Sequence, residues 1–209
     1  RKDAVIDELL HNIEDFIENA QIDLIYGEAT VTTDKIVIVN NQSYEAKHVI
    51  LATGSRPFVP PLKGLETANY YTTDTFFGIQ ELPKQLTIIG GGVIAIEMAF
   101  ALAPMGTKVT VLNHSTEILQ TEEPDARPII KEKMKQLGIE LITDFKFEEI
   151  RGNEIHTSCG VFTYENLLFA TGRRPNTQLA TKLGLAMDGH LIAVNNHYET
   201  NIPGIFAIG

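Results

Sequence analysis

Residues 86–97 read Leu86-Thr87-Ile88-Ile89-Gly90-Gly91-Gly92-Val93-Ile94-Ala95-Ile96-Glu97, so a short β-branched run meets three glycines and then an apolar segment. The short run predicts a buried strand, and the apolar segment predicts a helix that ends near Pro104 and Gly106. The twenty residues 87–106 hold one charged residue, Glu97. Because the glycines divide them into a strand and a helix, these residues do not form a membrane-spanning helix. We therefore expect no membrane contact.

The three glycines fit a phosphate-binding pattern. Gly90-Gly91-Gly92-Val93-Ile94-Ala95 matches G-x-G-x-x-G/A directly after a strand and at the start of a helix. In this pattern Gly90 permits a tight turn, Gly92 lacks the Cβ that would block a pyrophosphate, and Ala95 lets the helix approach the strand. Unpaired amides and the helix dipole then bind the anion. The pattern predicts a dinucleotide site at Gly90, Gly91, Gly92, Val93 and Ile94; a glycine turn used only for packing is the alternative.

The nucleotide preference of such a site is normally set at the end of the next strand, about 20 residues further on. The sequence places Asn113, His114 and Ser115 there. Asn113 bonds a ribose hydroxyl without repelling a 2′-phosphate, whereas a carboxylate would repel it. No arginine is present to attract that phosphate, and His114 attracts it only when protonated. The expected cofactor is therefore NAD or NADP.

The composition is that of an acidic globular protein. Its 209 residues include 17 Lys+Arg and 27 Asp+Glu, which gives a formal net charge of −10. This balance argues against nucleic-acid binding, which needs clustered basic residues. The single cysteine, Cys159, closes no internal disulfide, so the expected compartment is the reducing cytoplasm. No histidine has a partner at ligand spacing, and we expect no metal site.

Hydrophobic periodicity predicts the order of the elements. In the first part of the chain it predicts an amphipathic helix over residues 3–21 and strands at 22–26, 29–32, 36–39 and 47–52, with a hairpin turn at Asn40-Asn41. Asp74 is expected to cap a short helix that runs to residue 80. The later part predicts strands at 86–89, 108–112, 140–143 and 167–170, helices at 93–103 and 123–137, and an antiparallel insert over 145–162. Strands that alternate with helices imply a parallel sheet and an α/β fold.

Two segments of the chain repeat one another. Val49-Ile50-Leu51-Ala52-Thr53-Gly54-Ser55-Arg56-Pro57 is similar to Leu167-Leu168-Phe169-Ala170-Thr171-Gly172-Arg173-Arg174-Pro175. Each copy follows short β segments, so the chain is expected to hold two related units. The glycine turn lies 82 residues before Gly172, and the same distance before Gly54 falls ahead of residue 1. We therefore expect this chain to be a fragment of a longer protein.

Together these motifs resemble the pyridine nucleotide-disulfide oxidoreductases, the flavoproteins that include dihydrolipoamide dehydrogenase, glutathione reductase and mercuric reductase. The segments that carry the resemblance are Gly27-Glu28-Ala29, residues 52–57, Leu82-Pro83, residues 90–97, residues 170–176 and residues 200–209. They extend over nearly the whole chain. Val93 departs from the family pattern, because many members have a tyrosine at that position.

The resemblance implies a Rossmann-like three-layer NAD(P)-binding domain over residues 55–175, with a parallel sheet and an antiparallel β insert. This domain interrupts a partial FAD-binding domain made of residues 1–54 and 176–209. The resemblance also assigns Glu97, Thr171, Gly172 and Arg173 to the pyridine nucleotide, and Ala52, Thr53, Gly54 and Gly209 to FAD in the full-length parent. On its chemistry alone, Glu97 is expected to be a buried carboxylate that needs a partner; a capped acid on the helix face is the alternative.

The implied function is the binding of NAD(P)H for hydride transfer to flavin in an FAD-dependent oxidoreductase, which then reduces a disulfide or another small redox acceptor. The parent enzyme is expected to be a homodimer. The cysteine pair of the family is missing from these 209 residues. We therefore assign no catalytic residue and expect the fragment alone to be inactive. A flavin-free Rossmann dehydrogenase and a non-catalytic dinucleotide-binding module remain as alternatives.

Overall fold

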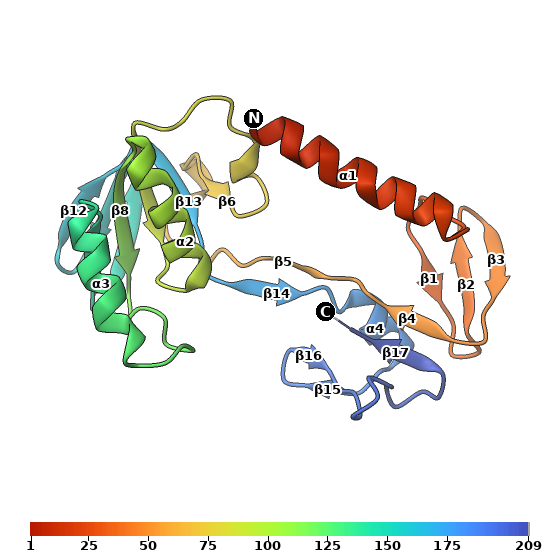
Figure 1. Ribbon diagram of the computed structural model, residues 1–209. Helices are drawn as coiled ribbons and strands as arrows, with labels where there is room; N and C mark the ends of the chain where they lie inside the picture. The colour runs from red at the N-terminus through yellow and green to blue at the C-terminus, as the bar shows by residue number, and fades with distance from the viewer. Residues whose placement is uncertain (209) are drawn as a thin grey trace. The chain divides into compact units, whose positions relative to one another are not determined.

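The computed structural model describes residues 1–208 and divides into two compact units (Figure 1). Unit 1 consists of residues 1–53 together with the residues from 177 onward, and unit 2 consists of residues 54–176. Among residues 1–208, no helix combines the length and the apolar character that crossing a bilayer requires.

The centre of unit 2 is a five-stranded parallel sheet. Its strands, in spatial order, are β6 (Tyr71–Thr72), β13 (Asn166–Phe169), β7 (Gln85–Ile89), β8 (Lys108–Asn113) and β9 (Glu140–Thr143). Helix α2 (Val93–Leu102) connects β7 to β8, and helix α3 (Ala126–Gln136) connects β8 to β9. The register pairs Ile89 with both Phe169 and Leu112, so the carboxyl ends of the three central strands meet at one edge. Ligands of open parallel sheets bind at this edge.

The side chains of the parallel sheet alternate between two cores. Leu86, Ile88 and Leu168 pack with α2 and α3 on one face. Ile89, Leu167 and Phe169 point to the other face, which the antiparallel sheet of β10 (Phe147–Arg151), β11 (Glu154–Thr157) and β12 (Gly160–Thr163) covers. This alternation is what a strand period of two requires when both faces are buried. Unit 2 therefore has three layers, as predicted: helices, parallel sheet and antiparallel sheet (Figure 1).

The last three residues of the two repeated segments pair with each other in unit 2. β5 (Ser55–Pro57) and β14 (Arg173–Pro175) form an antiparallel ribbon that the sequence pattern did not predict. Asn176 N–H donates to the Gly54 carbonyl at 2.9 Å, which extends the ribbon at the ends of the unit. The Arg174 guanidinium lies over the Phe58 ring, 4.0 Å from its centroid. The chain thus enters and leaves unit 2 along one paired ribbon.

Unit 1 contains helix α1 (Lys2–Asn19) and several small sheets. β1 (Thr30–Val31), β2 (Ile36–Val39) and β3 (Gln42–Glu45) form an antiparallel meander, β4 (Val49–Leu51) pairs in parallel with β17 (Ile205–Ala207), and β15 (Met187–Asp188) pairs with β16 (Leu191–Ile192). Asn40 and Asn41 connect β2 to β3 with φ angles of 51° and 63°, as the predicted hairpin turn requires. Helix α4 (Gln178–Leu183) packs on β4 and β17 through Ala180 and Leu183.

Two predicted elements are absent from the described residues. Residues 22–26 are exposed and form no strand. A strand needs a neighbouring strand for its backbone hydrogen bonds, and an apolar sequence pattern alone does not provide one. The predicted helix after Asp74 is a single 3₁₀ turn, η2 (Phe76–Gly78), and the Asp74 carboxylate accepts from Arg173 instead of capping a helix. Two further 3₁₀ turns are η1 (Leu65–Thr67) and η3 (Ala103–Met105).

One buried hydroxyl in the parallel sheet generates a prediction about stability. Among the described residues, Thr87 Oγ1 is buried without a hydrogen-bond partner. We expect Thr87→Val to raise the free energy of unfolding by about 1–2 kcal/mol, because the cost of an unsatisfied hydroxyl disappears. Thr110 faces Thr87 on β8 and donates to Glu140 at 3.0 Å, so Thr110→Val should instead be destabilising. Urea unfolding of both variants checks this, and a loss of stability in Thr87→Val would contradict it.

Candidate functional site

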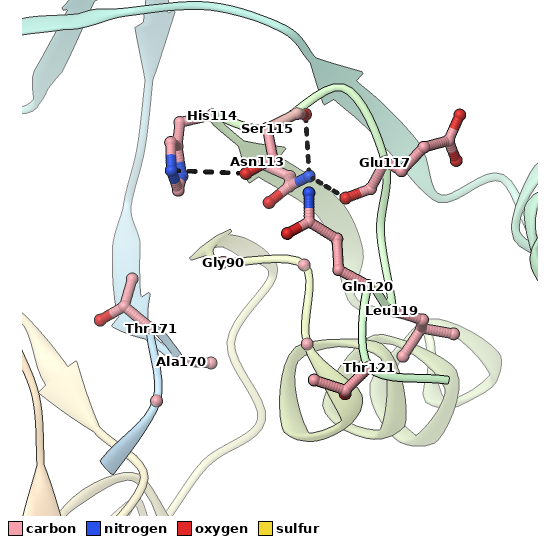
Figure 2. Close-up of a pocket in the computed structure, with 13 residues that line it drawn as sticks. Gly90, Asn113, His114, Ser115, Glu117, Leu119, Gln120, Thr121, Ala170 and Thr171 are labelled. Atoms are coloured by element: carbon pink, nitrogen blue, oxygen red, sulfur yellow. Dashed lines mark hydrogen bonds between the residues drawn. The ribbon is translucent and has the colours of Figure 1, made fainter. Parts of the chain in front are cut away.

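A cavity of about 270 Å³ lies at the carboxyl edge of the parallel sheet in unit 2 (Figure 2). Three stretches of chain line it: residues 90–92 after β7, residues within 113–121 from the last residue of β8 onward, and residues 170–172 after β13. Of the residues predicted to bind a dinucleotide, the structure gathers Gly90, Gly91, Gly92, Asn113, His114, Ser115, Thr171 and Gly172 around this cavity.

The first two glycines are required by the protein itself. Gly90 has a φ of +123°, and a Cβ there would lie 2.3 Å from the carbonyl oxygen of Ala170. A Cβ on Gly91 would lie 2.6 Å from Cγ of Asn113. Around Gly92, in contrast, no atom lies within 4 Å of the position that a Cβ would occupy. Packing therefore explains Gly90 and Gly91 and leaves Gly92 with open space in front of it.

Gly92 is also the N-cap of α2. Its φ and ψ of −81° and −178° are those of an ordinary N-cap, and no side-chain oxygen caps the helix. The first amides of a helix have no partner within the helix, and its N-terminus carries about half a positive charge. On the other side of the turn, the Gly91 carbonyl accepts from the Leu119 N–H at 2.7 Å. This end of α2 presents its positive pole and an open cradle, which suits an anion.

Asn113 is held in one orientation at the floor of the cavity. Only 5% of it is exposed, and its Nδ2 donates to the carbonyls of Ser115 at 2.9 Å and Glu117 at 3.0 Å. Figure 2 shows Nδ2 turned toward these two carbonyls and the amide oxygen turned the other way. Since both amide protons are used within the protein, Asn113 offers a ligand a hydrogen-bond acceptor only.

The other polar groups of the cavity are modest in charge. His114 is exposed, with Nε2 3.4 Å from Ser115 Oγ, and the Thr171 hydroxyl donates to the Phe58 carbonyl. Lys131 Nζ lies 2.6 Å from the Glu117 carboxylate, and this hydrogen bond holds the pKa of Glu117 below its usual value. In Figure 2 the Glu117 carboxylate points away from the glycine turn. Among the described residues that line the cavity, none is Lys or Arg.

A second cavity of unit 2, about 280 Å³ in volume, contains three further predicted residues: Ile94, Glu97 and Arg173. Phe76, Phe77 and Met98 form part of its apolar wall. The expectation that Glu97 is buried is wrong, because the helix presents this residue at the surface. Arg173 is anchored: Nη1 lies 2.6 Å from Asp74, and Nη2 donates to the Ser55 carbonyl at 2.7 Å. Val93 is exposed and lines neither cavity.

A comparison with protein-family models matches residues 2–209 to the pyridine nucleotide-disulphide oxidoreductase family. The chain belongs to this family. It is 31% identical over 217 residues to a dihydrolipoyl dehydrogenase of Acholeplasma laidlawii, and 32% identical over 207 residues to a mercuric reductase of Staphylococcus aureus. These matches cover 100% and 93% of this chain, but the chain spans only 65% and 38% of the length of those two relatives.

A solved structure has the same fold. It is that of the HOCl-induced flavoprotein disulfide reductase RclA from Escherichia coli, with a TM-score of 0.86 and 27% identity. The match covers 97% of this chain and 49% of that one. The mixed α/β architecture, with its parallel five-stranded sheet and antiparallel sheets, is thus the architecture of a flavoprotein disulfide reductase, as the fold prediction stated.

Ala52, Thr53 and Gly54, which were also predicted to bind a cofactor, line neither cavity. Ala52 and Thr53 follow β4 in unit 1 and are exposed, and Gly54, with a φ of +61°, begins unit 2. Gly209 lies outside the described residues. No group of three His, Cys, Asp or Glu side chains among the described residues is arranged to hold a metal ion.

The sequence pattern missed one wall of the first cavity, formed by Leu119, Gln120 and Thr121. Figure 2 shows the Gln120 side chain pointing toward Asn113. These residues belong to a segment of twelve residues, 114–125, between β8 and α3. Most connections in compact domains are about 4–6 residues long, and longer ones are often functional. The length of this loop was therefore the signal in the sequence that could have identified the wall.

The crowding at Gly91 generates a prediction. We expect Gly91→Ala to lower the free energy of unfolding by about 1–3 kcal/mol, because the added Cβ overlaps the buried Asn113 side chain. Gly78→Ala is the control, since no atom lies within 4 Å of a Cβ at that position. Chemical denaturation of both variants measures the difference. Equal stability of Gly91→Ala and the wild-type protein would contradict the described packing of the turn.

Proposed function

We propose that unit 2 binds NAD(P)H, with the pyrophosphate at the N-terminus of α2. The observation that carries this proposal is the place of Gly92, which lines the cavity and is the N-cap of α2. Packing requires a glycine at the two preceding positions, but no atom lies within 4 Å of the position that a Cβ of Gly92 would occupy. A diphosphate fits the unpaired amides and the positive end of the helix dipole. The parallel-sheet edge and the family membership support the same assignment.

In this proposal the adenosine ribose lies against Asn113, His114 and Ser115, and Thr171 and Gly172 form the opposite wall. The nicotinamide end lies toward the second cavity, where Ile94, Glu97 and Arg173 meet. Apolar walls from Phe76, Phe77 and Met98 suit a flat heteroaromatic ring. Because Asp74 and Ser55 already hold the Arg173 guanidinium, it forms a fixed part of that wall.

For the whole protein we propose an FAD-dependent oxidoreductase of the cytoplasm that acts on a disulfide or another small acceptor as a homodimer. Ala52 and Thr53, exposed at the carboxyl end of β4 beside the parallel strand β17, fit a nucleotide, and with Gly54 and Gly209 they would contact FAD. When bound, NAD(P)H supplies the hydride and FAD accepts it. The part of the chain in unit 2 positions the donor and excludes water from it.

We expect Gly92→Ser to weaken NADH binding at least about tenfold while it preserves stability, because Ser is a favourable N-cap residue but fills the cradle. Binding is measured by titration of NADH fluorescence, and stability by urea unfolding. Gly78→Ser is the matched control, at an exposed glycine whose added Cβ would also meet no atom within 4 Å. Unchanged NADH affinity in a folded Gly92→Ser variant would place the nucleotide elsewhere.

The acceptor-only surface of Asn113 also predicts a preference between the two nucleotides. We expect the affinity for NADH to be at least about tenfold higher than the affinity for NADPH. The ribose 2′-hydroxyl of NADH can donate to the amide oxygen of Asn113, whereas the oxygens of a 2′-phosphate cannot. Ser115→Arg should raise the affinity for NADPH relative to NADH, because a guanidinium pairs with the 2′-phosphate. Parallel titrations with the two nucleotides check this. Tighter binding of NADPH by the wild-type protein would contradict it.

A further inference from the structure

Arg127 occupies an unusual place in α3. It is the second residue of the helix, where a cation opposes the positive end of the helix dipole. Its guanidinium turns back to the preceding loop and donates to three backbone carbonyls: Nε to Leu119 at 3.2 Å, and Nη2 to Gln120 and Glu122, each at 3.1 Å. A basic residue at this position does not stabilise the helix. Its three hydrogen bonds to loop carbonyls give a reason for an arginine here.

The loop that Arg127 holds contains a residue in an unfavourable conformation. Leu119 has a φ of +51°, in the left-handed region that a leucine rarely adopts. Such a conformation persists only where the surroundings determine it. The Leu119 side chain is buried in the core with α2 and α3, and its carbonyl accepts from both Arg127 and the Glu122 N–H. Arg127 is thus one of the groups that keep Leu119 in place.

Leu119 in turn determines the orientation of the glycine turn. Its N–H donates to the Gly91 carbonyl at 2.7 Å. In a planar trans peptide the N–H of the following residue points opposite to the carbonyl. Because the Gly91 carbonyl points to Leu119, the Gly92 N–H points away from it. Without this hydrogen bond, two adjacent glycines can rotate their shared peptide and present a carbonyl oxygen where an anion would bind.

We propose that Arg127 is a positioning residue for the diphosphate of the dinucleotide. Its guanidinium holds Leu119, and Leu119 holds the Gly91–Gly92 peptide with its N–H available to the ligand and its carbonyl turned away. Arg127 itself lines neither cavity, so its effect passes through the loop. The inference rests on the proposed function, because it takes the ligand at Gly92 to be NADH.

The test compares Arg127→Met and Arg127→Lys with Arg151→Met. Arg151 lies on β10 in the antiparallel sheet, where it pairs with Glu149, so its loss removes the same charge at a distance from the glycine turn. We expect NADH affinity, measured by fluorescence titration, to fall about tenfold in Arg127→Met, as loss of hydrogen bonds to a charged donor implies. The NADH affinity of Arg127→Lys should lie between those of the wild type and Arg127→Met, because an ammonium lacks the planar guanidinium that reaches several carbonyls. Arg151→Met should bind as the wild type does.

Hydrogen exchange of the Leu119 amide gives a second measurement that needs no ligand. This amide should be protected in the wild type and in Arg151→Met and should exchange faster in Arg127→Met. The inference would be overturned if Arg127→Met bound NADH as tightly as the wild type does, or if its Leu119 amide exchanged at the wild-type rate. Equal losses of affinity in Arg127→Met and Arg151→Met would also overturn it. If Arg127→Met does not fold, Arg127→Lys carries the same comparison. A wild-type protein that binds no NADH would instead refute the proposed function, whatever the exchange at Leu119.

Discussion

The arrangement of unit 2 depends on a very close approach of two backbones at the carboxyl edge of the parallel sheet. Gly90, directly after β7, lies so near the carbonyl of Ala170, directly after β13, that no side chain fits between them. This approach brings the segments after β7 and β13 together, and the segment after β8, the neighbour of β7 in the sheet, completes the lining of the cavity. The hydrogen bond from Leu119 to Gly91 then fixes the turn from its other side. The packing of the turn and the shape of the cavity are therefore set by the same few backbone atoms.

The sequence was a good guide wherever periodicity was strong. The run that ends at Ile89 and the apolar segment from Val93 became β7 and α2 within one residue of their predicted bounds. The glycine pattern predicted the turn, and the structure adds that Gly90 and Gly91 serve packing while only Gly92 faces open space. The spacing to Asn113 brought that residue to the same cavity. These are local properties, which a linear pattern contains.

What the sequence did not predict depends on contacts between distant segments. β5 and β14 are too short and too polar to read as strands, and they exist because each supplies the other's hydrogen bonds. The sequence suggests that Asp74 caps a helix, but its carboxylate accepts a hydrogen bond from the Arg173 guanidinium, 99 positions away in the chain. The orientation of the Asn113 amide follows from two carbonyls of a loop whose path no local pattern specifies. No local sequence pattern distinguishes Arg127, because its three carbonyl partners become evident only in the folded loop.

The ribbon of β5 and β14 also bears on how a chain acquires a unit of this kind. Ser55 faces Pro175 across the ribbon, and Asn176 bonds to Gly54, so the first and last residues of unit 2 are neighbours. The chain therefore enters and leaves unit 2 at neighbouring points, as it would enter and leave a short loop. The entropic cost of closing a loop rises only slowly with the number of residues in the loop. Because its first and last residues are neighbours, unit 2 occupies a position in the chain that a short hairpin loop could also occupy.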